Sequence, residues 1–431
     1  MIYFNPKMTI KPLGRITPFK TSLIFACLLM GLCYSDVRAQ TYDIVLKGGH
    51  VIDPKNNINE VMDVAIQGNK IAAVAKNIDV KQAKLVVDAK SMYVTPGLID
   101  IHGHFFPGAG RGDPSPDGFT LRSGVTTAVD AGSSGWKSFP AFKKETIDRA
   151  KTRIFAFLNI VGEGFAGKSE QDTSDMNAKL TADFALKNKE HIVGFKVAHY
   201  NRRDWVPIDR AAEAGRLAGG LPIMIDFGGA TPFLPLDSLY RVKFKPGDIY
   251  THMFGGNPLT GETRPGGREA NVNSKGQVKP FVLAAQKRGI IFDVGFGGAS
   301  FSFAQAIPAL KSGFLPNTMG TDMNYHSFGG SMKDILNVMS SLMAIGMDLQ
   351  SAIKAATWTP AQVIKHPELG HLSVGTVADI AVLNVRQGNF GFWDKDNYKV
   401  MGKQKLECEL TVRDGKVVYD FRGIAVPLPA K

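Results

Sequence analysis

The segment Pro96-Gly97-Leu98-Ile99-Asp100-Ile101-His102-Gly103-His104 ends an apolar run with two histidines that are two residues apart. Side chains at positions i and i+2 of a β-strand point to the same face of a sheet. A strand that ends in this way directs two imidazole rings toward one point, which is how a protein begins a site for a divalent metal ion. A strand histidine is often an ordinary core or surface residue, so the pair alone leaves both interpretations open.

The segments around this one predict an α/β barrel over residues 96–371. Eight apolar runs are typical of strands, and helical patterns such as residues 172–188 and 209–217 separate several of them. The eight runs comprise residues 98–104, 126–133, 153–160, 192–199, 221–229, 248–254, 290–297 and 316–323. Eight parallel strands with intervening helices close into a TIM-like (β/α)8 barrel, whose site lies at the carboxyl ends of the strands. An open doubly wound sheet is the alternative, and the count of eight favours the barrel.

Both ends of the chain carry short alternating segments that are typical of antiparallel strands. Residues 40–95 and 372–431 are therefore predicted to form one small β-sandwich domain, which the barrel interrupts. A further segment, residues 255–279, follows the sixth barrel strand and is rich in Gly, Pro, Asn and charge. A long irregular loop in a compact domain is usually functional or disordered, so we interpret this segment as a candidate lid.

The first 39 residues have the pattern of a secretory signal peptide. Four basic residues precede an apolar run at 23–33, and Val37-Arg38-Ala39 offers small residues at the positions before a cleavage site. The run is too short to span a bilayer, which favours a cleaved signal over a membrane helix. An uncleaved anchor is the alternative. The prediction is a protein exported across the inner membrane to the periplasm, with no stable membrane anchor after cleavage.

The charge balance points away from nucleic acid. The formal net charge is +12, and it falls to +8 without residues 1–39, which hold five basic residues and one acidic residue. The remaining excess is spread out and forms no basic block interleaved with aromatic residues, so we expect mild attraction for anions only. Cleavage leaves Cys408 as the single cysteine, which excludes an intrachain disulfide in the mature chain. A homo-oligomer is compatible with these numbers.

Polar residues end several of the predicted barrel strands, where an unpaired charge would be costly. They are His102, His104, Lys196, Asp226, His252 and Asp322. Because the carboxyl ends of barrel strands share one face, we expect these side chains to meet. Binding a metal ion together would satisfy them at lower cost than burying each alone.

At this point the sequence resembles the amidohydrolase superfamily, and within it the deacetylase-like branch near dihydroorotases and D-aminoacylases. The resemblance covers almost the whole mature chain. It is carried by residues 96–104, Gly194-Phe195-Lys196, residues 248–252 and 292–303, Thr321-Asp322, residues 357–361 and residues 370–379. The first and last of these motifs are specific in combination, whereas Gly-Phe-Lys alone is weak.

The resemblance implies a role for each residue of the cluster. His102 and His104 would bind the more buried metal ion, and His252 would bind a second one. Lys196, carboxylated by CO2 on its amine, would bridge the two, and Asp322 would touch the first ion and carry the proton of the nucleophilic water. One or two divalent ions are expected, with Zn²⁺ preferred and Mn²⁺ as the alternative. Lys196 could instead stay uncarboxylated and pair with Asp226 or with Asp322.

The chain departs from the family pattern at three positions. Asp226 stands where a strand-five histidine is usual, and it could bind the second ion or pair with Lys196 or an arginine, leaving one metal. Phe296 stands between two glycines where the branch has a histidine. Asn324 stands where a histidine often follows the catalytic aspartate, and His326 close by could replace it. Both of the latter changes lie in the expected substrate pocket.

The predicted function is hydrolysis of an amide or ester bond of a small molecule by a metal-activated water, with Asp322 as the catalytic proton carrier. N-acyl amino acids and acylated hydroxy acids are the expected substrates. Arg111, Arg202 and Arg203 are candidates for binding a substrate carboxylate, with His199 at the rim, although each arginine could be an ordinary surface residue. A cyclic amidase of the dihydroorotase or hydantoinase type is a second candidate. A degenerate, metal-poor binding protein is a third.

Overall fold

The computed structural model describes residues 41–109, 113–165, 167–226, 234–256 and 268–427. The predicted signal peptide and Arg111 lie outside these residues. In the described part of the chain, no helix is long and apolar enough to cross a membrane. The described residues, from Thr41 onward, belong to one compact unit.

Seven parallel strands of the described residues form one sheet in chain order, as the sequence predicts for a barrel. They are β6 (Leu98–Gly103), β7 (Val125–Gly135), β8 (Arg153–Asn159), β9 (Ile192–Val197), β10 (Ile223–Ile225), β11 (Ile249–Tyr250) and β12 (Ile291–Phe292). Every residue of β6, β7 and β9 is buried, so both faces of these strands are covered, as is usual in an all-parallel sheet.

Residues 316–323 close this sheet into a ring. They bridge β12 through Asp293 and Thr318 and bridge β6 through Gly103 and Met323, in parallel both times. Backbone bonds support both seams, because Val294 N donates to Thr318 O at 3.1 Å and His104 N donates to Met323 O at 2.7 Å. The eighth predicted strand therefore occupies its expected place, although its pairing is too short to make a regular strand.

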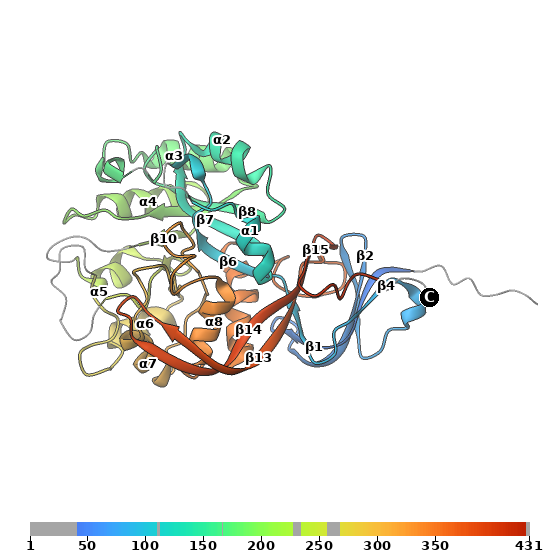
Figure 1. Ribbon diagram of the computed structural model, residues 1–431. Helices are drawn as coiled ribbons and strands as arrows, with labels where there is room; N and C mark the ends of the chain where they lie inside the picture. The colour runs from blue at the N-terminus through green and yellow to red at the C-terminus, as the bar shows by residue number, and fades with distance from the viewer. Residues whose placement is uncertain (1–40, 110–112, 166, 227–233, 257–267, 428–431) are drawn as a thin grey trace, which may run out of the picture. The chain divides into compact units, whose positions relative to one another are not determined.

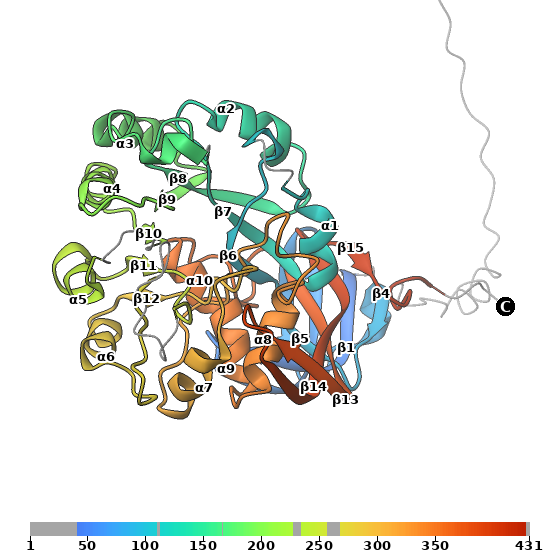
Figure 2. The same cartoon turned by 60° about the vertical axis from the view of Figure 1, so that its left-hand side comes forward.

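Helices follow the strands around the outside of the ring, where Figure 2 shows α3 to α6 outside β8 to β12. The helices are α1 (Asp117–Thr120), α2 (Phe139–Phe142), α3 (Ala178–Lys187), α4 (Val206–Leu217), α5 (Leu236–Ser238), α6 (Pro280–Lys287), α7 (Phe303–Lys311), α8 (Ile335–Met343), α9 (Leu349–Ala356) and α10 (Trp358–Val363). The helical pattern at 172–188 begins only at Ala178, because the Asn177 side chain accepts a hydrogen bond from Leu180 N and caps the helix there.

A second sheet joins the two ends of the described chain. Its path is β15-β14-β13-β5-β1-β2-β3, with β4 beside β1. The strands are β1 (Tyr42–Asp53), β2 (Ile58–Gln67), β3 (Lys70–Ala75), β4 (Ala83–Asp88), β5 (Tyr93–Pro96), β13 (Ile380–Trp393), β14 (Lys399–Arg413) and β15 (Lys416–Asp420). Leu46 and Val64 share a core with Ile380 and Leu410. The α/β fold class with a separate β-domain is confirmed, whereas the domain limits stay predictions.

The long hairpin of β13 and β14 leaves this sheet and runs along the barrel past α8 (Figure 1). Its tip contacts the barrel, because Asp394 Oδ2 accepts a bond from Phe303 N at 2.8 Å and Lys395 N donates to Phe301 O at 3.2 Å. Phe301 in turn stacks on Phe296, with ring centroids 4.1 Å apart. The β-domain therefore supports a loop at the carboxyl end of the barrel.

Gly97, at the entry to β6, is held between the two parts of the chain. Its N–H donates to Asp379 O at 2.8 Å, just before β13. A Cβ atom at this position would lie 2.2 Å from Oγ1 of Thr126, a residue of β7. Only glycine therefore allows β6 and its neighbour to approach this closely.

We expect Gly97→Ala to lower the free energy of unfolding by about 1–3 kcal/mol, because the added methyl group overpacks a buried contact. Gly118→Ala is the matched control, because a Cβ atom at Gly118 meets nothing within 4 Å. Denaturant unfolding of both variants, followed by circular dichroism, measures the difference. Equal stability of the two variants would show that the contact with Thr126 is relieved at no cost.

Candidate metal centre

Three predicted ligands converge at the carboxyl end of the barrel. His102 and His104, at the end of β6, and Asp322, after the eighth segment, each offer one ligand atom, and these atoms lie within 4.8 Å of one another. His104 Nε2 is 3.1 Å from Asp322 Oδ1, and His102 Nε2 is 3.6 Å from the same oxygen. Two imidazole nitrogens and a carboxylate oxygen are a donor set that suits Zn²⁺, so the residues present fit a divalent ion.

The other ring nitrogens of both histidines are held by the barrel. His102 Nδ1 lies 2.7 Å from Thr251 Oγ1 and 3.4 Å from Asp293 Oδ2, and His104 Nδ1 lies 3.0 Å from Ser133 Oγ. Partners of this kind orient metal-binding histidines and leave Nε2 free toward the ion. Burial, followed by the charge of Lys196, lowers the pKa of His102 to about 4. The imidazole is therefore neutral at pH 7, which is the form that binds a metal ion.

Asp322 adopts a backbone conformation that few non-glycine residues occupy, with φ at +51°. The hydrogen bond from Asp322 N to His102 O, 2.6 Å long, ties this turn to β6. Asn324 Nδ2 donates to Asp322 O at 2.9 Å and lies 3.3 Å from Asp322 Oδ1. Burial raises the pKa of Asp322, but the hydrogen bond with His104, followed by the interactions with His102 and His252, outweighs it and lowers the pKa below its ordinary value. Asp322 is therefore an ionised carboxylate at neutral pH.

Lys196 lies in β9 and is one of the largest fully buried side chains of the described core. Its Nζ is 3.3 Å from His102 Nε2, so the amine reaches the cluster as the sequence predicts. Gly132 makes room for it, because a Cβ atom there would lie 2.6 Å from Lys196 Cγ. Burial lowers the pKa of Lys196, which increases the fraction of neutral amine.

Asp226 stands at the end of β10, beside one arginine and two histidines. Its Oδ1 accepts a bond from Arg268 Nη2 at 2.9 Å, and its Oδ2 lies 3.3 Å from His252 Nε2 and 3.5 Å from His199 Nε2. Burial raises the pKa of Asp226, but the Arg268 guanidinium, followed by His252, outweighs it and holds the pKa well below its ordinary value. The other ring nitrogen of His252, Nδ1, lies 2.5 Å from Gly295 O.

Arg268 is a residue of the candidate site that the sequence did not single out. It belongs to the irregular segment 255–279, where no periodicity assigns a direction to a side chain. The sequence signal that could have pointed to such a partner was Asp226, because a buried carboxylate at a strand end is costly unless a cation pairs with it. An arginine partner for Asp226 was one of the alternatives, but nothing in the sequence pointed to this one.

The predicted substrate residues have different surroundings. Phe296 is buried under Phe301, and Asn324 contacts Asp322 as described. His199 packs edge-on against Phe165 and pairs with Glu170 Oε2 at 3.3 Å. His326 is exposed and lies over Tyr325. Arg202 and Arg203 are also exposed, which favours their interpretation as surface arginines.

Buried carboxylates behind the cluster also escaped sequence reasoning, because a lone acidic residue in a strand has no distinctive spacing. Asp100 accepts bonds from Thr321 Oγ1 at 2.5 Å, Thr321 N at 3.0 Å and His102 N at 3.1 Å. Burial raises the pKa of Asp100 to about 7. Asp293 accepts bonds from Thr318 Oγ1 and Gly320 N. Both residues anchor the closing segment to the barrel.

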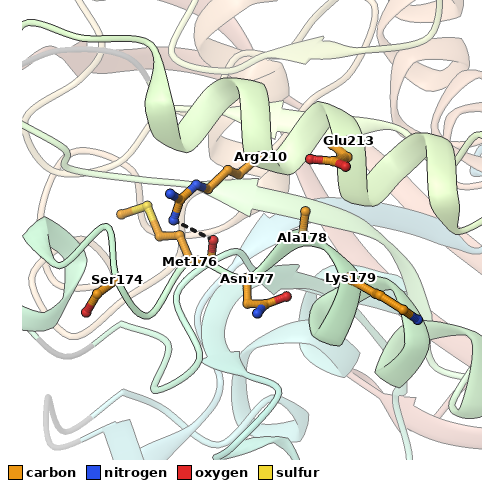
Figure 3. A pocket seen from close by; sticks show the side chains of 7 residues that line it. All are labelled: Ser174, Met176, Asn177, Ala178, Lys179, Arg210 and Glu213. Atoms are coloured by element: carbon orange, nitrogen blue, oxygen red, sulfur yellow. Dashed lines mark hydrogen bonds between the residues drawn. The ribbon is translucent and has the colours of Figure 1, made fainter.

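A separate cleft lies on the outer ring, between α3 and α4 (Figure 3). Its lining residues are Ser174, Met176, Asn177, Ala178, Lys179, Arg210 and Glu213. Arg210 crosses it and donates to Met176 O at 2.9 Å. None of these residues belongs to the cluster at the strand ends, and the arrangement offers no set of metal ligands or nucleophiles.

Comparisons with known proteins identify the family of this chain. The model of the Amidohydrolase family matches residues 302–418. A protein named deacetylase from Brucella anthropi is 30% identical over 323 residues, which cover 73% of this chain and 77% of that protein. Two solved structures, titled as an adenine deaminase and a dihydroorotase, superpose with TM-scores of 0.78 and 0.76 at 26% and 27% identity. Each covers 88% of this chain, with 100% and 99% of the solved chains matched. The chain belongs to the amidohydrolase family, in its deacetylase-like branch.

Proposed function

We propose that this chain is a metal-dependent hydrolase that removes the acyl group from a small amide, such as an N-acyl amino acid, or from an acylated hydroxy acid. The convergence of His102, His104 and Asp322 carries this proposal, because it supplies a metal site at the face where barrel enzymes act. The similarity to a Brucella anthropi protein named deacetylase supports the reaction class.

His102, His104 and Asp322 would hold the divalent ion, with Zn²⁺ preferred and Mn²⁺ as the alternative. Such an ion lowers the pKa of a bound water toward about 7 and polarises a scissile carbonyl. Asp322 would accept the proton of the attacking water and return it to the leaving nitrogen or oxygen, since its lowered pKa keeps it ionised. Phe165, edge-on to His104 with centroids 5.0 Å apart, would help to exclude bulk water from the cluster.

Lys196 would carry a carboxyl group on its amine. The charges of Asp226 and Asp322 raise the pKa of Lys196, but burial outweighs them and lowers it, so these carboxylates only partly offset the cost of burying an ammonium group. A neutral amine forms a bond to the carbon of CO2 and releases a proton, and the lowered pKa of Lys196 increases its neutral fraction. The product is an anion with two oxygen ligands, which favours a divalent cation nearby.

The chain would act after export. The pattern of residues 1–39 supports cleavage after Ala39 and release into the periplasm.

A cyclic amidase is the second candidate function, and the superposition on a solved dihydroorotase favours it. The same metal cluster serves both reactions, and the pocket around Phe296 and Asn324 decides between them. A panel of N-acyl amino acids, acylated hydroxy acids, hydantoins and dihydroorotate separates the two. We expect turnover of the acyl compounds, and turnover of the cyclic amides alone would contradict the deacetylase proposal.

We expect His102→Ala to abolish hydrolysis and to remove the tightly bound metal ion, because it deletes one of three converging ligands. The measurement is elemental analysis of protein purified with Zn²⁺ or Mn²⁺ and bicarbonate, together with turnover of the best substrate. His50→Ala is the matched control, since His50 lies in β1 of the other sheet and contacts Asn59. Unchanged activity of the His102 variant would overturn the metal assignment. A wild-type content clearly below one ion per chain would favour a degenerate binding protein.

We expect Lys196→Arg to lose activity, because a guanidinium cannot form a carbamate and brings a permanent positive charge to the cluster. Protein equilibrated with ¹³C-bicarbonate should show a carbamate carbon resonance that the variant lacks. Lys187→Arg, an exposed change at the end of α3, is the control. Retention of full activity by the Lys196 variant would rule the carbamate out.

A further inference from the structure

The surroundings of Asp226 do not fit a second metal ion. Both oxygens of this carboxylate are already engaged, Oδ1 by Arg268 and Oδ2 by His252 and His199. The residue that would be the second ligand, His252, directs its Nε2 to the same carboxylate rather than to open space. Among the described residues, the group whose ligand atoms converge is the separate set of His102, His104 and Asp322.

Arg268 already supplies a cation at this place. Its side chain is mostly buried, with 16% of its surface exposed, so solvent screens its charge little. The guanidinium stays protonated in proteins, and its repulsion would oppose a divalent ion sharing the same carboxylate. Arg268 thus supplies to Asp226 the positive charge that a second divalent ion would otherwise supply, and a second ion would place two further positive charges beside this guanidinium.

The guanidinium also has an unused donor. Arg268 Nη2 is bonded to Asp226, but Arg268 Nη1 is buried and has no hydrogen-bond partner among the described residues. A buried donor without an acceptor costs free energy, and such exceptions are expected where a ligand completes the site. A fixed N–H group beside the metal cluster would donate a hydrogen bond to an oxygen of the bound substrate.

We propose that Arg268 takes the place of a second metal ion: its guanidinium neutralises Asp226, the chain holds a single divalent ion at His102, His104 and Asp322, and Nη1 donates a hydrogen bond to an oxygen of the bound substrate. The metal count rests on the proposed function only in assuming that the cluster binds a metal. The role of Nη1 rests on it fully.

Metal stoichiometry tests the first part without any turnover. Titration of the metal-free full chain with Co²⁺ in bicarbonate, followed by the visible absorption of bound Co²⁺ and by elemental analysis, should saturate at one ion per chain. Arg268→Met removes the charge at similar length and should allow a second ion, because Asp226, His252 and Lys196 become available to it. Arg210→Met, a change in the cleft between α3 and α4, should leave the value at one.

Two ions per wild-type chain would overturn the proposal, and so would a single ion in the folded Arg268→Met protein. If that variant does not fold, as judged by its melting temperature, the wild-type value still decides the metal count. The double change Asp226→His with Arg268→Met then provides the second test, because it restores a neutral ligand in place of the ion pair. That protein should bind two ions.

Kinetics test the role of Nη1. Loss of one positioned donor to a substrate oxygen should lower kcat/KM about 10²–10³-fold in Arg268→Met, with partial retention in Arg268→Lys. A loss on both an N-acyl amino acid and its uncharged amide would assign Nη1 to the scissile carbonyl. A loss on the acid alone would assign it to the carboxylate. Activity within twofold of wild type would overturn the role. A chain with one ion and no hydrolysis of any acyl compound would instead refute the proposed function and leave the metal count intact.

Discussion

The closure of the barrel by residues 316–323 is the constraint on which the site depends. This segment has no regular strand, and it is held by Asp322 N on His102 O, by His104 N on Met323 O and by the buried carboxylates of Asp100 and Asp293. The same contacts that complete the ring place Asp322 beside the two histidines. Stability and function are therefore coupled here, since a change that loosens the closing segment also moves a ligand.

The carboxyl end of the barrel gathers charges that would be costly one by one, and the structure compensates them in two separate ways. His102, His104 and Asp322 form a donor set around one point. Asp226 is instead satisfied by Arg268 and two histidines. In the proposed single-metal site, the aspartate on the fifth strand would therefore replace a metal ligand with one half of an internal ion pair.

The barrel and the first histidine pair were predictable because buried parallel strands often read as apolar runs, and a His-x-His at a strand end places two imidazole rings on one face. The place of Lys196 followed from the same argument. Arg268 was not predictable, because it lies in a segment without periodicity, and only the tertiary structure brings it to Asp226. Asp100 and Asp293 were missed for a related reason: their role is to hold a segment more than twenty residues away, which leaves no trace in local spacing. The start of α3 shifted because a cap at Asn177 outweighed the residues before it.

The order of the chain has a consequence for how the protein matures. His102 and Thr321, the neighbour of Asp322, are 219 positions apart in the sequence, yet they lie on adjacent segments of the barrel. A contact of such long range forms only after the intervening chain has condensed, so it belongs to the late steps of folding. A nascent or truncated chain that lacks residues 316–323 therefore has no complete metal-binding site. A metal ion that binds at this cluster would bind only the folded barrel, and binding would therefore stabilise the folded state over the unfolded state.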